Sequence, residues 1–323
     1  NIFSGKYTNL IFIVLLFLTL AISFFKIAFQ HYEPPASDSI QWRTSAEPLI
    51  EYNKIHKDQA LWNPNIFSGM PAYLISLKAK YPYFDSLRKL TDKVMNWRIF
   101  YLFLAAVGVY LLMLMLGFEP FIAFISAIAF SFSCHFIGLM EIGHNTKYRA
   151  VMLIPWIYLS IVYLRKHTDL LGLGMTSVFL IIQLKENHPQ ISYYTFLLIG
   201  IYWIFQLIWA IKEKRIGNFF LFSVLMLFSF IIVFMAVSQQ YLLDYEYGKF
   251  SIRGAGGLEK GYAQSWSFHP LEILTFWNPG FFGGTSPYYW GWMPFTQTSM
   301  YMGIIVFILM IFGIFNFKVK TAK

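Results

Sequence analysis

The sequence predicts an all-α integral membrane protein, and three observations lead to that prediction. Only 13% of the 323 residues are charged, whereas 57% are hydrophobic. A soluble domain of average composition carries about 25% charged residues, so this chain has too little charge to cover a water-exposed surface. Its apolar residues gather in runs near the roughly 20 residues that a helix needs to cross a bilayer. The charges cluster between these runs, so lipid must be part of the solvent.

Eight apolar runs are predicted to cross the membrane. Two of them, Ala150–Leu164 and Leu170–Leu184, are only about 15 residues long and could be short, tilted or shielded from lipid by their neighbours. The other six approach or reach the length of a full span: Leu10–Gln30, Ile99–Leu116, Phe121–Met140, Ile191–Ile211, Ile216–Val237 and Thr298–Phe317.

The orientation follows from basic residues in short loops, which mark the cytoplasmic side. Eight crossings place four basic sites on one side, whereas six crossings would move Arg165 and Lys166 to the other. Both termini are therefore predicted to be cytoplasmic. The four sites are Lys6, Arg165 with Lys166, Lys212 with Lys214 and Arg215, and Lys318 with Lys320 and Lys323.

This topology gives one polytopic membrane domain, residues 1–323, with large outer loops at residues 30–98 and 238–297. In the first loop, Ser45–Lys57 and Phe84–Asn96 have helical spacing, with Pro48 near the start of the former. We expect both helices to lie along the membrane surface. Trp62–Pro64 and Ser68–Pro71 are typical of tight turns between them.

Several classes of protein are disfavoured by the sequence. The net charge of +9 comes without a basic helix or an RNA-binding motif, so we expect no nucleic-acid partner. The single cysteine, Cys134, cannot form an internal disulfide, and together with His135 it is expected to be a packing residue. No P-loop, dinucleotide-binding or zinc motif is present.

Asp38 is the first candidate for chemistry on the outer side. It lies about eight residues beyond the first predicted span, after Pro34 and Pro35, which stiffen the chain as it leaves the bilayer. Asp38 should therefore stay close to the membrane surface. The alternative is a solvated loop aspartate or a helix N-cap.

Two short outer loops carry further ionisable residues. The loop Glu141–Arg149 contains His144, Lys147 and Arg149, which could hold a phosphate or simply anchor lipid headgroups. Glu186 and His188 lie at membrane depth, where ionisable residues usually line a cavity. With Asp38 they could form an acid–base set or share a divalent metal, although their spacing is not diagnostic and the cofactor stays unknown.

The last outer loop combines cations with many aromatic rings. Arg253 is a candidate ligand for an anion, and the rings could stack on a sugar or form an interfacial belt. The aromatic residues are Tyr245, Tyr247, Trp266, Phe268, Trp277, Tyr288, Tyr289, Trp290 and Trp292.

Taken together, these positions resemble the YfhO family of bacterial membrane proteins, particularly its Bacteroidetes members. Each matching stretch is short, but they occur in the family's order over nearly the whole chain. Family members are generally longer, so the chain would correspond to an N-terminal portion. The stretches are Ser37–Gln41, Trp62–Pro71, Gly143–Lys147, Asn187–Tyr194, Phe250–Gly254 and Gly257–Gly284.

The resemblance implies a GT-C-type glycosyltransferase of a bacterial inner membrane, with juxtamembrane helices in its first outer loop. The implied reaction is transfer of a sugar from a polyprenyl-phosphate donor to a cell-envelope acceptor, with Asp38 as general base. From their charge and depth, His144, Lys147, Arg149 and Arg253 would hold the leaving phosphate. Glu186 and His188 would position the donor or a metal.

Two other functions are compatible with the same residues. A transporter or flippase would line its path with buried ionisable groups, but the sequence has no internal repeat and only Pro155 lies well inside a span. A non-catalytic subunit of an envelope assembly would use the outer loops to dock membrane partner subunits.

Overall fold

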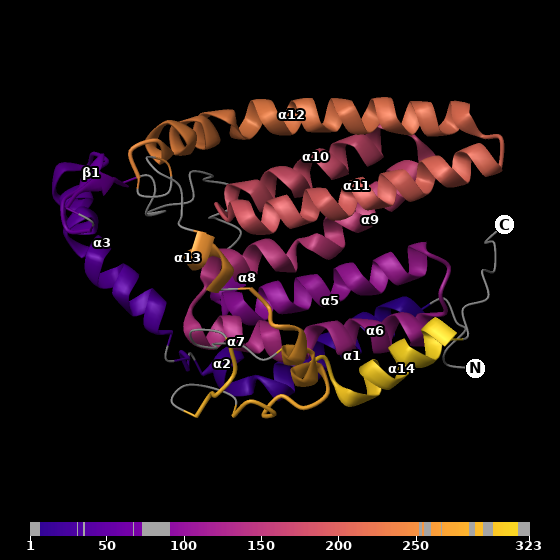
Figure 1. Ribbon diagram of the computed structural model, residues 1–323, viewed down its shortest axis with the longest axis horizontal. Coiled ribbons are helices and arrows are strands. Elements are labelled where there is room, and N and C mark those ends of the chain that lie inside the picture. Colours follow the sequence, from indigo (N-terminus) through magenta and orange to yellow (C-terminus); the bar gives the residue numbers. More distant parts are fainter. Residues whose placement is uncertain are drawn as a thin grey trace.

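The computed structural model describes residues 7–30, 32–34, 36–66, 68–72, 91–251, 254, 260–265, 267–283, 288–292 and 300–315. The regular structure in these ranges is almost entirely helical. Most helices lie side by side along the long axis of the molecule (Figure 1). The all-α architecture predicted from the sequence is confirmed.

Four of the described helical segments are long and apolar enough to cross a membrane. They are α5 (Trp97–Met115), α6 (Pro120–Ser131) continued by α7 (Cys134–Ile142), α11 (Pro189–Lys212) and α12 (Ile216–Gly248). Three shorter apolar helices are α1 (Thr8–Ser23), α10 (Leu170–Lys185) and α14 (Ile304–Phe315). Helix α12 continues past its predicted end at Val237, so the first part of the predicted 238–297 loop is helical.

Besides the span that α6 and α7 share, two further predicted spans are interrupted helices. The first is α1 followed, after Phe24, by the short α2 (Phe25–Phe29). The run predicted at Ala150–Leu164 is longer than expected, because α8 (Asn145–Met152) leads through Leu153 into α9 (Ile154–His167). Pro155 in the first turn of α9 has no amide hydrogen to donate, which explains a break at this point.

Polar contacts fix which helix ends lie together at one end of the bundle. Tyr110, near the end of α5, donates to Asn9 Oδ1 over 2.8 Å. Arg165 Nε, in the last turn of α9, donates to Gln206 Oε1 of α11 over 3.0 Å. Lys166 Nζ donates to the Met115 carbonyl oxygen of α5. We call this the Arg165 end of the bundle, and the opposite end the Asp38 end.

The bundle contains two apolar cores. One is built from α1, α2, α5, α6, α7 and α8, and the other from α9, α10, α11 and α12. The two meet where α9 packs on α5: Trp156 Nε1 donates to the Leu104 carbonyl over 2.8 Å. Gly108 allows this approach, since a Cβ there would lie 2.8 Å from Trp156 Nε1.

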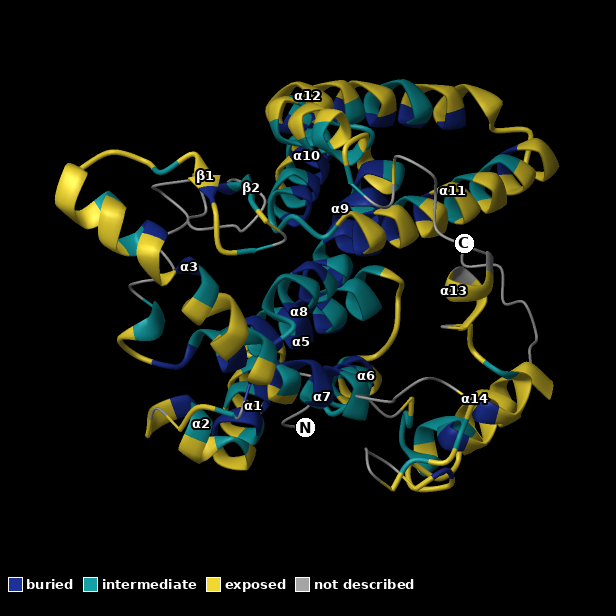
Figure 2. Cartoon of the chain, turned by 60° about the vertical axis from the view of Figure 1, so that its left-hand side comes forward, coloured by how far each residue is buried: buried dark blue, intermediate teal, exposed yellow. Residues whose placement is uncertain are grey.

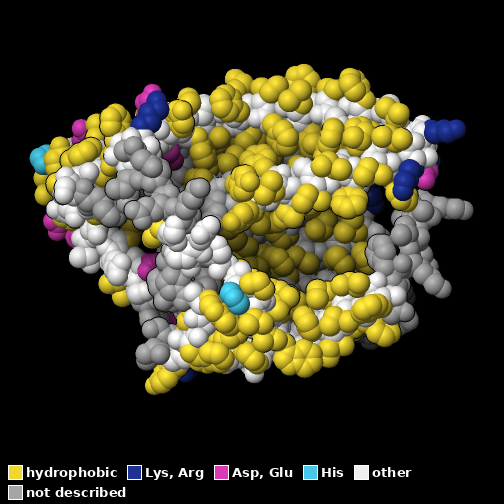
Figure 3. Space-filling view, viewed as in Figure 1, with side chains coloured by type: hydrophobic (Ala, Val, Ile, Leu, Met, Phe, Trp, Pro, Cys, Tyr) yellow, Lys and Arg dark blue, Asp and Glu magenta, His cyan; other side chains and the backbone are white. Residues whose placement is uncertain are grey.

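The outward faces of the helices are apolar, as expected for contact with lipid. Only 17% of the apolar window of α11 is buried within the protein, and α11, α12 and α14 are mostly exposed in Figure 2. Figure 3 shows a broad hydrophobic band, hollowed along its middle, with charged side chains toward the two ends of the long axis. The chain thus has the surface of a multi-pass membrane protein.

The helix predicted at Ser45–Lys57 is longer and starts earlier than expected. Helix α3 runs over Ser37–His56, leaves the bundle at the Asp38 end (Figure 1) and contains Pro48 in its interior. It packs on a small antiparallel pair, β1 (Trp62–Asn63) and β2 (Met70–Pro71), where the predicted turns lie. The predicted helix Phe84–Asn96 falls mostly outside the described residues.

The last outer segment is mainly irregular. It contains α13 (Lys260–Ser265) and the 3₁₀ helix η3 (Pro270–Phe276). Glu272 of η3 is buried, and its Oε1 accepts hydrogen bonds from the Tyr289 hydroxyl and from the Trp292 amide. In the same segment, the rings of Phe282 and Trp290 pack edge to face.

Candidate functional site

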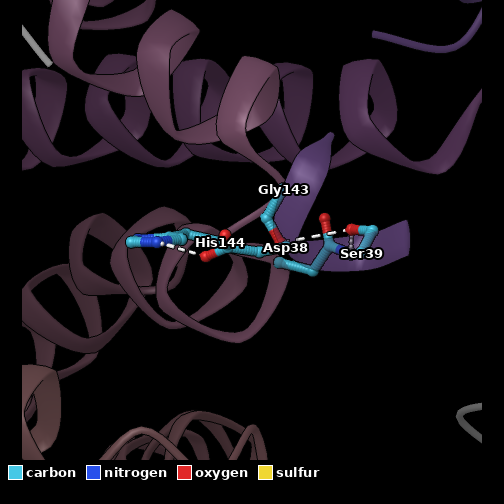
Figure 4. Close-up of polar contacts among 5 residues, drawn as sticks. Asp38, Ser39, Gly143 and His144 are labelled. Carbon is cyan, nitrogen blue, oxygen red and sulfur yellow. Dashed lines mark hydrogen bonds and ion pairs between the residues drawn. The ribbon is translucent and has the colours of Figure 1, made fainter. Parts of the chain in front are cut away.

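The start of α3 is tied to the turn between α7 and α8, about a hundred residues later in the chain (Figure 4). The Ala36 amide donates to the Glu141 carbonyl over 2.8 Å. Asn145 Nδ2 donates to Ser39 Oγ over 2.9 Å, and Ser39 Oγ donates to the Gly143 carbonyl over 3.3 Å. Asp38, which lies between these anchored residues, therefore has a defined position at the edge of the bundle.

Gly143 makes this close approach possible. Its φ of +91° lies in the left-handed region that glycine adopts at little cost. A Cβ at this position would lie 2.6 Å from Ser39 Oγ and 3.1 Å from the Ser39 amide nitrogen. The turn therefore needs glycine both for its backbone conformation and for its contact with α3.

Asp38 and His144 form a close pair, with Oδ2 and Nε2 2.7 Å apart (Figure 4). Their side chains are 42% and 31% exposed, so a reactant can reach them. Asp38 stands in the first turn of α3 and is neither a loop residue nor the N-cap, which is Ala36. The His144 imidazole orients the Asp38 carboxylate, and its role as a phosphate ligand stays a prediction.

His188 lies at the start of α11, where its Nδ1 accepts a hydrogen bond from the Ile191 amide over 3.4 Å. Burial lowers the pKa of His188 below its ordinary value, and the nearby Lys147 lowers this pKa further. The α10–α11 turn and α8 therefore bring these two predicted site residues together. The His144 imidazole also lies within electrostatic reach of His188.

Lys147 is a half-buried cation without a counter-ion in the described part of the chain. No hydrogen bond or ion pair to its ammonium group is found among those residues. Burial lowers the pKa of Lys147, because the charged form is poorly solvated there. His135 of α7 interacts electrostatically with both Lys147 and His144, although its sequence position indicated only a packing role. We call His135, His144, Lys147 and His188 the outer His–Lys cluster.

Arg149 and Glu186 form an ion pair between α8 and the end of α10. Arg149 Nε donates to Glu186 Oε2 over 2.5 Å, and both side chains are mostly buried. The Tyr101 hydroxyl of α5 donates to the other carboxylate oxygen over 3.2 Å. An anion that binds Arg149 must therefore share it with Glu186, which is its counter-ion.

Two further predictions for the site concern a shared metal ion and Arg253. Among the described residues, no group of three or more His, Cys, Asp or Glu side chains could hold a metal ion, and Glu186 is paired with Arg149 and Tyr101. The hypothesis that Asp38, Glu186 and His188 share a divalent metal thus has no geometric support. Arg253 lies outside the described residues.

An apolar cavity of about 270 Å³ lies between α10, α11 and α12. The Tyr241 hydroxyl at its wall donates to the Leu184 carbonyl over 3.0 Å and is therefore already satisfied. The cavity can hold a hydrocarbon group but offers little to a polar one. It is lined by Leu184, Phe196, Phe230, Val233, Phe234, Val237, Ser238, Tyr241 and Leu242.

The fold and this site define a helical membrane protein that carries an accessible acid–histidine pair and the outer His–Lys cluster at one end. Comparisons of the chain with protein-family models, with curated protein sequences and with solved structures find no match.

Proposed function

We propose that this chain is a membrane glycosyltransferase of the GT-C type. In this proposal it crosses the membrane eight times, with the Arg165 end in the cytoplasm. At the Asp38 end, it moves a sugar from a polyprenyl-phosphate donor to a cell-envelope acceptor. The resemblance to the YfhO family suggested this reaction, and the site geometry gives it a chemical basis.

The observation that carries the proposal is the pairing of Asp38 with His144 near Lys147, a lysine without a counter-ion in the described chain. The His144 Nε2–H group donates to Asp38 Oδ2 and leaves Oδ1 without a hydrogen bond among the described residues. A carboxylate oriented in this way can accept a proton. Lys147 supplies positive charge nearby, and its incomplete solvation strengthens its attraction for an anion.

The transfer step uses these groups in a defined order. Asp38 accepts the proton of the acceptor hydroxyl as that oxygen forms a bond to the anomeric carbon of the sugar. The bond between this carbon and the phosphate oxygen breaks, and the phosphate leaves with the electron pair. Lys147 and His188 stabilise the charge that develops on the phosphate. The sugar ends on the acceptor, and protonated Asp38 releases its proton to water.

The apolar cavity supports a donor that carries a long hydrocarbon chain. Its walls come from α10, α11 and α12, and Glu186 and His188 lie in the turn between α10 and α11 at the Asp38 end. A lipid-linked donor could place its phosphate at the outer His–Lys cluster while part of its chain contacts these apolar walls. A soluble nucleotide sugar would gain nothing from this surface.

The proposal is tested by measuring sugar transfer from polyprenyl-phosphate sugars by the purified chain and its Asp38→Asn variant. Asparagine keeps the shape of the side chain but cannot accept the proton, so we expect a rate loss of roughly 10²- to 10⁴-fold. Glu51→Gln is the matched control, because Glu51 is an exposed carboxylate on the same helix.

Equal transfer by the wild type and Asp38→Asn would remove Asp38 as the base. If the wild type transfers no sugar from any such donor but moves lipid across vesicles, a flippase is the better interpretation. If it does neither and instead co-purifies with envelope proteins regardless of Asp38, the chain is a non-catalytic subunit.

A further inference from the structure

Arg98, in the first turn of α5, is a buried cation that takes no part in the proposed transfer. Only 4% of the residue is exposed. Its Nε and Nη1 atoms have no hydrogen-bond partner, and no ion pair to it is found among the described residues. An unpaired guanidinium group in such a place is costly, because it has lost water without gaining a counter-ion.

A second guanidinium group lies beside the same indole ring. The Cζ atoms of Arg98 and Arg149 are 4.7 Å and 5.4 Å from the centroid of the Trp97 ring. Their interaction with each other is repulsive. Glu186 forms its ion pair with Arg149 and so does not neutralise Arg98. Arg98 therefore has no ion-pair partner within the described chain.

Other nearby groups do not remove this charge. The carboxylates of Glu33 and Asp92 attract Arg98 through space, but neither reaches ion-pair distance within the described chain. The Tyr148 hydroxyl donates its proton to the Arg98 carbonyl over 2.7 Å, and its oxygen accepts no hydrogen bond from Arg98 Nε or Nη1. This bond holds α8 against the start of α5 and so fixes Arg149 near Arg98.

We infer that Arg98 and Arg149 form an anion site that takes the phosphate group of a membrane lipid. Planar guanidinium groups bind phosphate oxygens through paired hydrogen bonds. Helix α5 is long and apolar enough to cross a membrane and begins at Trp97, so a crossing by α5 would place Arg98 near the depth of lipid phosphates. This depth favours a lipid phosphate over a free one. The site does not depend on the proposed sugar transfer.

The first test uses protein stability without ligand, measured in detergent as the midpoint of thermal unfolding. Arg98→Met removes a buried charge that has no ion-pair partner in the described chain, so its midpoint should equal or exceed that of the wild type. Arg149→Met leaves Glu186 without its counter-ion, so its midpoint should fall. A structural role for Arg98 predicts the opposite for the first variant, namely a lower midpoint.

The second test measures binding of farnesyl phosphate, a short lipid phosphate, to the full chain. We expect Arg98→Met to weaken binding roughly tenfold or more, since hydrogen bonds to charged groups are lost. Arg98→Lys retains the charge and should bind with intermediate affinity. Farnesol should not compete. Competition by phosphatidylglycerol would identify a bilayer phospholipid as the occupant, and competition by inorganic phosphate alone would overturn the lipid assignment.

Arg165→Met is the matched control. Arg165 also lies over an aromatic ring, 5.8 Å from the centroid of Phe222, but at the opposite end of the bundle. The Arg165→Met variant should bind farnesyl phosphate with the affinity of the wild type. Unchanged binding by both Arg98→Met and Arg98→Lys would overturn the inference. Because Asp38→Asn should bind normally, loss of transfer and loss of this site are separable.

Discussion

The His188 ring can cap α11 only while its Nδ1 is unprotonated, so the start of this helix should be sensitive to pH. The pKa of His188 is lowered from the ordinary value of 6.5 by burial and by Lys147. As the pH falls below about 6.5, His188 becomes protonated in the unfolded chain, whereas in the folded chain it stays neutral to a lower pH. Stability contributed by neutral His188 is therefore present above this pH and lost below it.

We predict that His188→Gln flattens the fall in the thermal unfolding midpoint between pH 7 and pH 5. The variant lacks the titrating group, so less stability is lost on acidification. His56→Gln is the control, since His56 is exposed at the end of α3, where its ring contacts Tyr52. An identical pH profile for the wild type and His188→Gln would contradict the assignment.

Individual charges were easier to find from the sequence than their partners. Asp38, Lys147, Glu186 and His188 attract notice because ionisable groups are rare in so apolar a chain. Which cation faces which carboxylate depends on how separate helices dock. Arg98 was not singled out from the sequence, because an arginine at the start of a helix is ordinary. Its unusual property is that it is buried and that its Nε and Nη1 atoms have no hydrogen-bond partner among the described residues, which only the packing of the helices reveals.

At the scale of elements, the junction between α3 and the α7–α8 turn determines whether the site forms. We predict that Gly143→Ala releases α3, because it combines backbone strain at φ +91° with a clash against Ser39. A left-handed conformation costs a non-glycine residue about 1–2 kcal/mol. Gly117→Ala is a matched control, since Gly117 has φ +90° but a Cβ placed there would meet no atoms within 4 Å in the described chain.

The measurement is the rate of tryptic cleavage after Arg43, which lies on an exposed face of α3. Cleavage should be faster in Gly143→Ala than in Gly117→Ala. Backbone strain should lower the thermal unfolding midpoint of both variants. If the two variants behave alike, the contact with Ser39 does not hold α3 in place.

Helix boundaries could be predicted where the apolar pattern alone decides them. The predicted run Ile191–Ile211 nearly matches α11, since apolar residues fill it from end to end. Helix α3 starts earlier than predicted because its first turn is held by the Glu141 and Gly143 carbonyls of a distant turn. Such tertiary hydrogen bonds leave no local pattern in the sequence.

At the scale of the whole molecule, the number of crossings depends on the hairpin of α9 and α10. Each of these helices was predicted to be short, but α8 directly precedes α9, and the two together form a longer helical segment. The contacts of Arg165 with Gln206 and of Lys166 with Met115 place the α9–α10 turn at the ends of α11 and α5. The hairpin therefore runs from one end of the bundle to the other and back.

We predict that His167 and Lys214 face the cytoplasm, whereas Lys57 faces the opposite side. Basic residues near short loops are retained on the cytoplasmic side. The test places single cysteines at these three positions in a Cys134→Ala background and treats intact cells with a membrane-impermeant maleimide. Only Lys57→Cys should react before the cells are permeabilised. Reaction of His167→Cys together with Lys57→Cys, but not of Lys214→Cys, would reduce the count to six crossings.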